Sequence, residues 1–119
     1  FAPFCKKEDA PKYFDSFSFE NLEFMSYAPR VKEQYLDKLP SITHIDNTAR
    51  LQTVTEKSHE HFYELLTEFG KISETNVLLN TSFNIRGYPI LSTIDDALYA
   101  LENTEMDYVV IEDYLFEKP

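Results

Sequence analysis

The chain has 119 residues and a formal net charge of −10, with 43% hydrophobic residues and only three arginines. This balance fits one globular domain, or part of one, over residues 1–119, and it argues against a nucleic-acid or anionic membrane partner. The single cysteine, Cys5, excludes an internal disulfide, and no apolar segment approaches membrane-spanning length, so we expect a cytoplasmic protein.

The first forty residues are interrupted by four prolines and predict little regular structure. We expect a short helix over 7–14, an exposed loop over 16–21 and a short strand over 24–27. Because large aromatic side chains dominate core burial, we expect those of this segment to pack on a core rather than to bind a ligand. They are Tyr13, Phe14, Phe17, Phe19, Phe24 and Tyr27.

Residues 41–55 predict a β-hairpin that turns at 46–48, because Asp and Asn tolerate turn conformations. Alternation along the two strands then separates an apolar face from a polar face. The apolar face holds Ile45, Ala49 and Leu51, and the polar face holds His44, Arg50 and Gln52. That polar face either is solvated or lines a site.

Residues 58–70 carry the clearest helical pattern of the chain. Ser58 can cap the start of this helix and Gly70 can end it. Its apolar stripe, spaced i, i+3, i+4 and i+7, consists of Phe62, Leu65, Leu66 and Phe69. His59 and His61 are two positions apart and do not share a helical face, and no zinc motif is present, so we expect no metal site here.

A short apolar run, Val77–Leu79, predicts a buried strand, and a polar loop with a basic residue follows it. The loop offers hydrogen-bonding side chains and one guanidinium from Asn80, Thr81, Ser82, Asn84 and Arg86. Open α/β sheets place ligands beyond the carboxyl ends of their strands, so the loop predicts an oxyanion or nucleotide cradle. A polar turn that only satisfies its own backbone explains the same residues. Neither a P-loop nor a dinucleotide fingerprint is present.

Residues 93–96 have the form of a capping box, and a second helix is expected after them. Its buried stripe is expected to hold Ile94, Ala97, Leu98 and Leu101. Strands are predicted over 107–111 and 114–116. The second half of the chain therefore alternates helix, strand, helix and strand, which predicts an α/β fold with mixed helix and sheet content.

Three segments resemble the carboxy-terminal domain of the NodU/CmcH carbamoyltransferases. They are Phe1-Ala2-Pro3-Phe4, the run Thr43-His44-Ile45-Asp46-Asn47-Thr48-Ala49-Arg50-Leu51-Gln52-Thr53-Val54, and residues 78–90, which include Leu79-Asn80-Thr81-Ser82-Phe83-Asn84. The likeness spans nearly the whole chain. It implies a YrdC-like domain, a twisted mixed β-sheet with flanking helices.

The resemblance also implies a chemistry. Enzymes of this family use carbamoyl phosphate and ATP to form a carbamoyl-adenylate, with release of pyrophosphate. A separate amino-terminal domain of the actin-like ATPase fold, usually metal-bearing, then passes the carbamoyl group to a hydroxyl of a small-molecule acceptor. We therefore expect this chain to be a piece of a larger enzyme whose metal lies in that other domain.

Site roles follow from the same resemblance. Arg50, His44 and Ser82 are expected to be catalytic, with Arg50 gripping phosphate oxygens and His44 orienting substrate or donating a proton. The nucleotide and phosphate contacts are expected from Asn80, Thr81, Ser82, Asn84 and Arg86. His44 has an alternative role, a hydrogen bond that only steadies its turn.

The chain also departs from the family pattern. Family members carry a Lys-x-Arg segment just before Phe1, so this chain alone is expected to be inactive. Tyr88 stands where Glu or another polar residue is usual, and Asn47 stands where Gly is common, which costs little because Asn tolerates a left-handed turn.

Two other functions fit parts of the sequence. The domain could be a non-catalytic module that binds an anion or nucleotide, or that braces the amino-terminal domain. A threonylcarbamoyl-type tRNA-modifying domain shares the YrdC-like resemblance. The acidic composition and the segment from Thr43 to Arg50 weigh against that last function.

Overall fold

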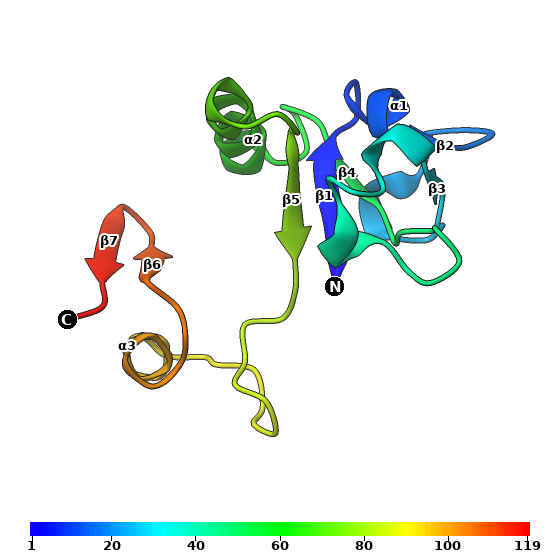
Figure 1. The fold of residues 1–119 in the computed structure, drawn as a ribbon. Coiled ribbons are helices and arrows are strands. Elements are labelled where there is room, and N and C mark those ends of the chain that lie inside the picture. The colour runs from blue at the N-terminus through cyan, green and yellow to red at the C-terminus, as the bar shows by residue number, and fades with distance from the viewer. The chain divides into compact units, whose positions relative to one another are not determined.

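A computed structural model describes residues 1–119 of the chain. It divides into two compact units, Phe1–Thr81 and Ser82–Pro119, which are described separately below (Figure 1). Helices and strands are mixed along the chain and one sheet contains both parallel and antiparallel pairs, which confirms the predicted α/β class.

The first unit is built on a three-stranded sheet in the order β4-β1-β5. Strand β1 (Ala2–Lys6) is central; β4 (Gln52–Val54) pairs with it in parallel, and β5 (Val77–Asn80) pairs with it antiparallel. Phe4 lies opposite Gln52 on one side and opposite Leu78 on the other. The apolar strand β1 thus joins two segments that are far apart in the sequence.

The β-hairpin predicted over 41–55 is wrong. Residues 44–48 form a tight turn, but the strand that follows pairs with β1 instead of with the segment before the turn. An isolated two-stranded hairpin is marginal in water, whereas pairing with a buried central strand places Leu51 in a core. Ala49 is buried as predicted, and Ile45 is fully exposed, contrary to prediction.

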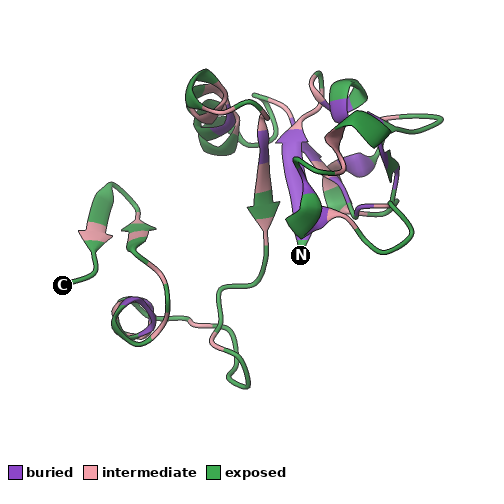
Figure 2. Ribbon diagram, viewed as in Figure 1, coloured by how far each residue is buried: buried purple, intermediate pink, exposed green.

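The larger core of the first unit lies beside β1 and is formed by short elements (Figure 2). These are the helix α1 (Ala10–Tyr13), strands β2 (Phe14–Asp15) and β3 (Arg30–Val31), and 3₁₀ turns at Leu22–Phe24, Glu33–Tyr35 and Pro40–Ile42. The predicted helix over 7–14 is therefore present but shorter, and 16–21 is an exposed loop apart from half-buried Phe19, as predicted.

The aromatic residues of the first third divide between core and surface. Tyr13 and Phe14 are buried and Phe19 packs against them, as predicted. Phe17, Phe24 and Tyr27 are exposed, so the prediction is wrong for these three.

The strand predicted over 24–27 is wrong, because a 3₁₀ turn ends at Phe24 and residues 25–27 have no regular structure. Leu22 is buried there, and Met25 adopts a left-handed backbone with φ 56°, which interrupts any extended run.

Helix α2 (Glu60–Ile72) packs on the sheet through a second, smaller core. Leu66 is fully buried with Phe4 and Val54, and the Phe62 ring meets the Phe4 ring edge-on at 5.6 Å between centroids. Phe62 and Leu65 each remain 50% exposed, so only part of the predicted stripe is covered.

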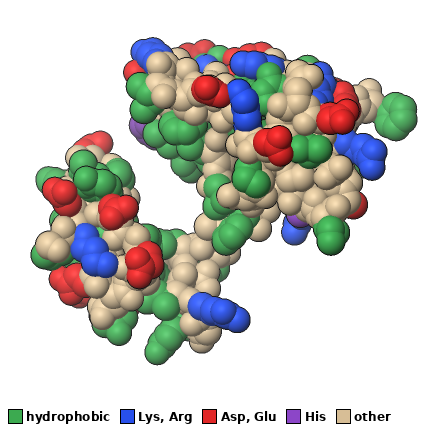
Figure 3. Space-filling view, viewed as in Figure 1, with side chains coloured by type: hydrophobic (Ala, Val, Ile, Leu, Met, Phe, Trp, Pro, Cys, Tyr) green, Lys and Arg blue, Asp and Glu red, His purple; other side chains and the backbone are tan.

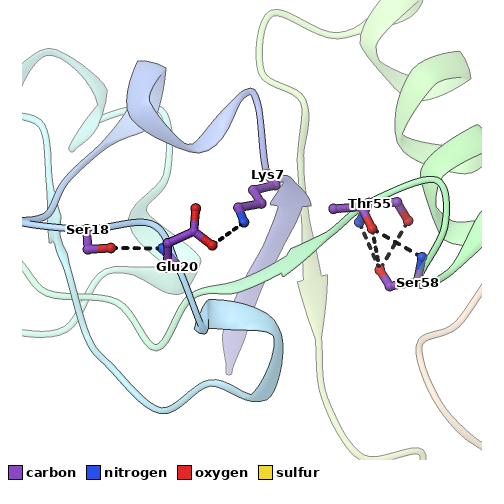
Figure 4. A network of polar contacts seen from close by, with 5 residues as sticks. All are labelled: Lys7, Ser18, Glu20, Thr55 and Ser58. Carbon is purple, nitrogen blue, oxygen red and sulfur yellow. Dashed lines mark hydrogen bonds and ion pairs between the residues drawn. The ribbon is translucent and has the colours of Figure 1, made fainter.

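The ends of α2 differ from prediction. Ser58 does not cap the helix, because its hydroxyl accepts from the Thr55 backbone N–H at 2.9 Å (Figure 4). His59 takes the capping position. At the other end the helix continues two residues past Gly70, whose missing side chain leaves room for Asn76.

Strand β5 lies at one edge of the sheet, and it is buried only at its start. Val77 is buried and Leu79 is 39% exposed, so the prediction of a fully buried strand is wrong. Elsewhere in this unit a Lys7–Glu20 ion pair of 2.7 Å joins the residue just after β1 to the loop that follows β2 (Figure 4).

The second unit contains helix α3 (Ile94–Asn103) and an antiparallel hairpin of β6 (Tyr108–Ile111) and β7 (Tyr114–Glu117). The predicted capping box is confirmed, since the Asp96 N–H donates to Thr93 Oγ1 at 3.1 Å and Thr93 N–H donates back to the Asp96 carboxylate at 3.2 Å. The hydrogen bonds from Thr93 hold the pKa of Asp96 below its ordinary value.

The apolar stripe of α3 is only partly buried. Ala97 and Leu101 are buried, whereas Ile94 is exposed. Hydrophobic side chains also reach the surface elsewhere, beside scattered acidic groups (Figure 3). No helix of the chain is long and apolar enough to cross a membrane.

Candidate functional site

The turn at residues 44–48 fixes a histidine by its backbone. The His44 N–H donates to the Thr48 carbonyl at 2.8 Å, and Asn47 N–H donates to the His44 carbonyl at 2.9 Å. Asn47 supplies the left-handed backbone the turn requires, with φ 63°, as expected for Asn where Gly is common. His44 itself is exposed at the edge of this rigid turn.

A chain of hydrogen bonds sets the orientation of the His44 ring. Thr48 Oγ1 and Thr48 N–H both donate to Asp46 Oδ1, at 2.7 and 3.1 Å, and they lower the pKa of Asp46. His44 Nδ1 lies 3.3 Å from Thr48 Oγ1. Because the single hydroxyl proton of Thr48 goes to Asp46, His44 Nδ1–H is the donor in this contact. The other ring nitrogen, Nε2, is therefore left without a partner in the chain and faces solvent.

Arg50 projects from a one-residue turn just after this network. The Leu51 N–H donates to the Ala49 carbonyl at 2.9 Å, which forms a γ-turn centred on Arg50. Ala49 and Leu51 point into the core while Arg50 is exposed, as the predicted alternation requires.

None of the three arginines makes an ion pair, although acidic residues outnumber basic ones by 21 to 11. All four ion pairs use lysines, at Lys7, Lys32, Lys38 and Lys71. Arg30, Arg50 and Arg86 thus keep their planar forks available for an anionic ligand, for which guanidinium groups are well suited.

Asn80 and Thr81 line a cavity of about 340 Å³ between the sheet and α2. Its apolar wall includes Phe4, Phe62 and Leu65, and its polar end is made by Gln52, Asn80 and Thr81. Asn80 Nδ2 donates to Gln52 Oε1 at 2.6 Å across β1. This bond leaves the Asn80 carbonyl oxygen and the Gln52 amide N–H groups for a ligand.

The remaining predicted residues belong to the second unit and lie in an exposed loop. Asn84 makes only long contacts of 3.4 Å to the Ile85 and Tyr88 carbonyls. A turn closed by the Tyr88 N–H and the Ile85 carbonyl at 2.9 Å has Gly87 at φ 86° in its third position, which is a type II turn. Arg86 occupies the outward corner of that turn, and Ser82 makes no hydrogen bond within the chain.

Two residues of the first unit, Arg30 and Gln52, received no functional role from the sequence, although the structure places them beside Thr48 and Asn80. Arg30 pairs with Thr48 in an isolated antiparallel bridge, and Gln52 holds Asn80. The predicted polar face of His44, Arg50 and Gln52 already included Gln52. Arg30 could not be placed beside Thr48 from the sequence, because no local sequence pattern shows the backbone bridge that joins them.

The Cys5 thiol and the side chains that could bind a metal do not form a second reactive site. Burial raises the pKa of the Cys5 thiol, with smaller contributions from Asp9 and Glu8, so Cys5 is not a thiolate nucleophile. No group of three His, Cys, Asp or Glu side chains is arranged to hold a metal ion.

Comparison with known proteins identifies relatives over the whole chain. The family model described as carbamoyltransferase C-terminus matches residues 1–118. Nodulation protein NolO of Bradyrhizobium diazoefficiens is 37% identical over 99% of this chain. The 3'-hydroxymethylcephem-O-carbamoyltransferase of Amycolatopsis lactamdurans is 32% identical over 98%, and an uncharacterized Synechocystis protein is 47% identical over 68%.

The chain is similar to only a small part of each relative. It covers 22% of the Bradyrhizobium and Amycolatopsis proteins and 13% of the Synechocystis protein.

Proposed function

Because the chain belongs to the carbamoyltransferase C-terminus family, we propose that it forms part of an O-carbamoyltransferase. In this proposal the parent enzyme activates a carbamoyl group with ATP and transfers it to a hydroxyl of a small-molecule acceptor. Carbamoyl phosphate and ATP are the substrates, the fold is YrdC-like, and the enzyme acts in the cytoplasm. An amino-terminal domain of the actin-like ATPase fold, with any metal, supplies the transfer step.

The proposal rests on two features of a domain that matches the family model. One is a histidine oriented by hydrogen bonds, and the other is a nearby arginine that makes no ion pair. His44 is oriented by Thr48 and Asp46, and Arg50 follows Thr48 by two residues at the centre of a γ-turn. Preorganised donors of this kind are what phosphate chemistry needs, since such reactions depend mainly on positioning and on stabilising charge.

The proposed reaction releases both inorganic phosphate and pyrophosphate. Carbamoyl phosphate first loses its phosphate to water, which gives carbamate and inorganic phosphate. A carbamate oxygen then attacks the α-phosphorus of ATP, the bond to the β-phosphate oxygen breaks, and pyrophosphate leaves. Each turnover of this sequence therefore yields one phosphate, one pyrophosphate and one carbamoyl-adenylate.

Arg50 and His44 have defined roles in these steps. The Arg50 guanidinium donates to phosphate oxygens that gain negative charge as pyrophosphate departs. The His44 ring, with Nδ1–H donated to Thr48, offers Nε2 as acceptor to the attacking water or as donor to a departing phosphate oxygen.

The polar groups after β5 complete the assignment. The Gln52–Asn80 amide pair and the Thr81 hydroxyl present donors and acceptors that match a carbamoyl amide. In the second unit, Ser82 and Asn84 are assigned to phosphate or carbamoyl contacts, and Arg86 to a phosphate, because the loop leaves their side chains exposed.

A non-catalytic module is the second candidate function. The exposed apolar residues of α2, such as Phe62 and Leu65, favour it because they are suited to contact with another domain. In that case the domain binds an anion or nucleotide, or braces the amino-terminal domain, without contributing to turnover.

Substitution in the full-length enzyme distinguishes the two candidates. Arg50→Ala and Ser82→Ala are each expected to lower carbamoyl-phosphate-dependent release of pyrophosphate by roughly 100-fold, the usual effect of losing one donor to developing charge. Lys57→Ala is the matched control, because Lys57 is exposed and makes no ion pair. Circular dichroism and urea unfolding check that each variant remains folded.

The two possible results have separate meanings. Loss of pyrophosphate release in folded Arg50→Ala and Ser82→Ala enzymes, with normal release by Lys57→Ala, supports catalysis by this domain. Turnover like that of the wild type in both site variants would reject the residue assignment and favour the non-catalytic module.

A further inference from the structure

Strand β5 leaves one of its two edges unpaired. It is the last strand of its sheet, and β1 is the strand with which it pairs. An unpaired edge presents N–H and C=O groups that readily bind another strand, and soluble proteins usually protect such edges with charged side chains, proline or a β-bulge. β5 has the sequence Val-Leu-Leu-Asn and an uninterrupted register, so it carries none of these protections. The edge is therefore suited to accept a further strand.

The hydrogen bonds of β1 show which backbone groups of β5 face outward. The Lys7 N–H donates to the Val54 carbonyl at 2.9 Å, so the backbone groups of Lys7 face β4. Because the groups of alternate residues point to the same side of a strand, those of Cys5 face β4 as well. Cys5 lies opposite Val77, which makes this a pair without mutual hydrogen bonds. The N–H and C=O groups of Val77, and of Leu79 two residues on, therefore point away from β1.

Apolar side chains flank this free edge on both faces of the sheet. The cavity of about 340 Å³ beside α2 is bordered by β5, and no charged side chain lines it, although 27% of the chain is charged. On its α2 wall Phe62 and Leu65 are each 50% exposed. Leu79, which alternates with Leu78 and so points to the opposite face, is 39% exposed. One strand added to β5 would cover the apolar surface on both faces.

The chain is a small part of its relatives, so a strand for this edge can come from the same polypeptide. It covers 22% of the Bradyrhizobium and Amycolatopsis proteins. A tethered segment binds at a high effective concentration, which favours it over a separate molecule. The uncharged lining of the cavity selects an apolar segment, because a charged side chain placed there would lose its hydration without gaining a partner.

We propose that an extended, uncharged segment of the parent polypeptide, from outside these 119 residues, adds as a strand to the free edge of β5. Its backbone bonds to the outward groups of Val77 and Leu79, and its side chains on the α2 face pack on Phe62 and Leu65. In such strand addition, main-chain hydrogen bonds give affinity and the side-chain contacts give specificity. The inference rests on the proposed function only in treating the chain as part of a longer enzyme.

Hydrogen–deuterium exchange of the full-length enzyme, read residue by residue, tests the backbone pairing. The amides of Leu78 and Asn80 face β1 and serve as internal references. We expect the Val77 and Leu79 amides to exchange within roughly tenfold of these references, because strands paired on both sides open together. Faster exchange of Val77 and Leu79 than this would show a free edge and overturn the proposal.

Photo-crosslinking of the same enzyme identifies the added strand. Benzoylphenylalanine in place of Leu65 is expected to crosslink to an apolar segment of the same polypeptide outside residues 1–119. The same group in place of Glu64, which lies outside the cavity, is the matched control and is not expected to do so. Leu79→Pro removes the outward N–H and is expected to abolish the crosslink, whereas Leu79→Ala keeps that N–H and the crosslink. Circular dichroism checks that each variant is folded.

Four crosslinking results would overturn the proposal. They are no crosslink from the Leu65 position, a crosslink confined to residues 1–119, a crosslink that joins two enzyme molecules, and an undiminished crosslink in folded Leu79→Pro enzyme. Exchange and crosslinking are both measured without ATP or carbamoyl phosphate. Failure of pyrophosphate release therefore bears on the proposed function alone, and failure of these two measurements bears on the added strand alone.

Discussion

Gly70→Ala tests whether the end of α2 is fixed by its contact with Asn76. A Cβ added at Gly70 would lie 2.4 Å from Asn76 Oδ1 and 2.6 Å from its Cγ, far inside van der Waals contact. The Asn76 amide cannot move freely, because its Nδ2 donates to Asp9 at 3.3 Å and its backbone N–H donates to the Tyr13 hydroxyl at 2.9 Å.

Whether Gly70→Ala raises or lowers the free energy of unfolding depends on the size of two opposing effects. Alanine in place of glycine inside a helix stabilises by about 1 kcal/mol. Displacing the Asn76 amide costs about 1 kcal/mol for the lost hydrogen bond to Asp9 and about 1–3 kcal/mol for overpacking. We therefore expect Gly70→Ala to lower the free energy of unfolding by about 1–3 kcal/mol.

A double-mutant cycle makes this expectation specific. In an Asn76→Ala background the obstacle is gone, and Gly70→Ala is expected to raise the free energy of unfolding by about 1 kcal/mol. The coupling energy between the two positions is then about 2–4 kcal/mol. Urea unfolding followed by circular dichroism at the helix band measures all four proteins. Equal effects of Gly70→Ala in both backgrounds would refute the reasoning.

Three further substitutions test other parts of the fold by urea unfolding. Thr53→Val is expected to stabilise by about 1 kcal/mol, because the buried Thr53 hydroxyl has no hydrogen-bond partner; destabilisation would contradict this. Leu66→Ala is expected to cost about 2–5 kcal/mol, since Leu66 is fully buried between α2 and the sheet, and a cost below about 1 kcal/mol would show that this core is loose. The pKa of Asp96 is lowered in the folded state, so its contribution to the free energy of unfolding is complete above about pH 4 and is lost as pH falls through the folded pKa. Asp96→Asn is expected to remove this acid dependence of stability. An unchanged profile of stability against pH would contradict the expectation.

Elements with a strong local pattern could be predicted from the sequence. Helix α2 follows from its periodicity, strands β6 and β7 from their apolar and aromatic runs, and α3 from its capping box. Each depends on residues close together in the chain, where spacing and caps decide the structure.

Elements that depend on distant pairing could not be predicted. Strand β4 pairs with β1 rather than with the segment before its own turn, and nothing in residues 41–55 encodes that partner. In the first third of the chain Leu22 is buried while Phe17 and Tyr27 are exposed. Hydrophobicity alone did not distinguish the three residues.

The residues of the candidate site also divide into those that a local pattern predicts and those that depend on distant pairing. The turn at His44 and the outward position of Arg50 follow from local turn chemistry and alternation, so they could be predicted although the hairpin was wrong. Arg30 and the Gln52–Asn80 contact depend on strand register, which only the folded chain displays.

The most direct test of the proposed function is pyrophosphate release from ATP by a full-length enzyme that carries this domain, with and without carbamoyl phosphate. We expect release only when carbamoyl phosphate is present, with inorganic phosphate formed in equal amount, and no release by the 119-residue chain alone. Absence of carbamoyl-phosphate-dependent release by a demonstrably folded full-length enzyme would contradict carbamoyl-adenylate formation.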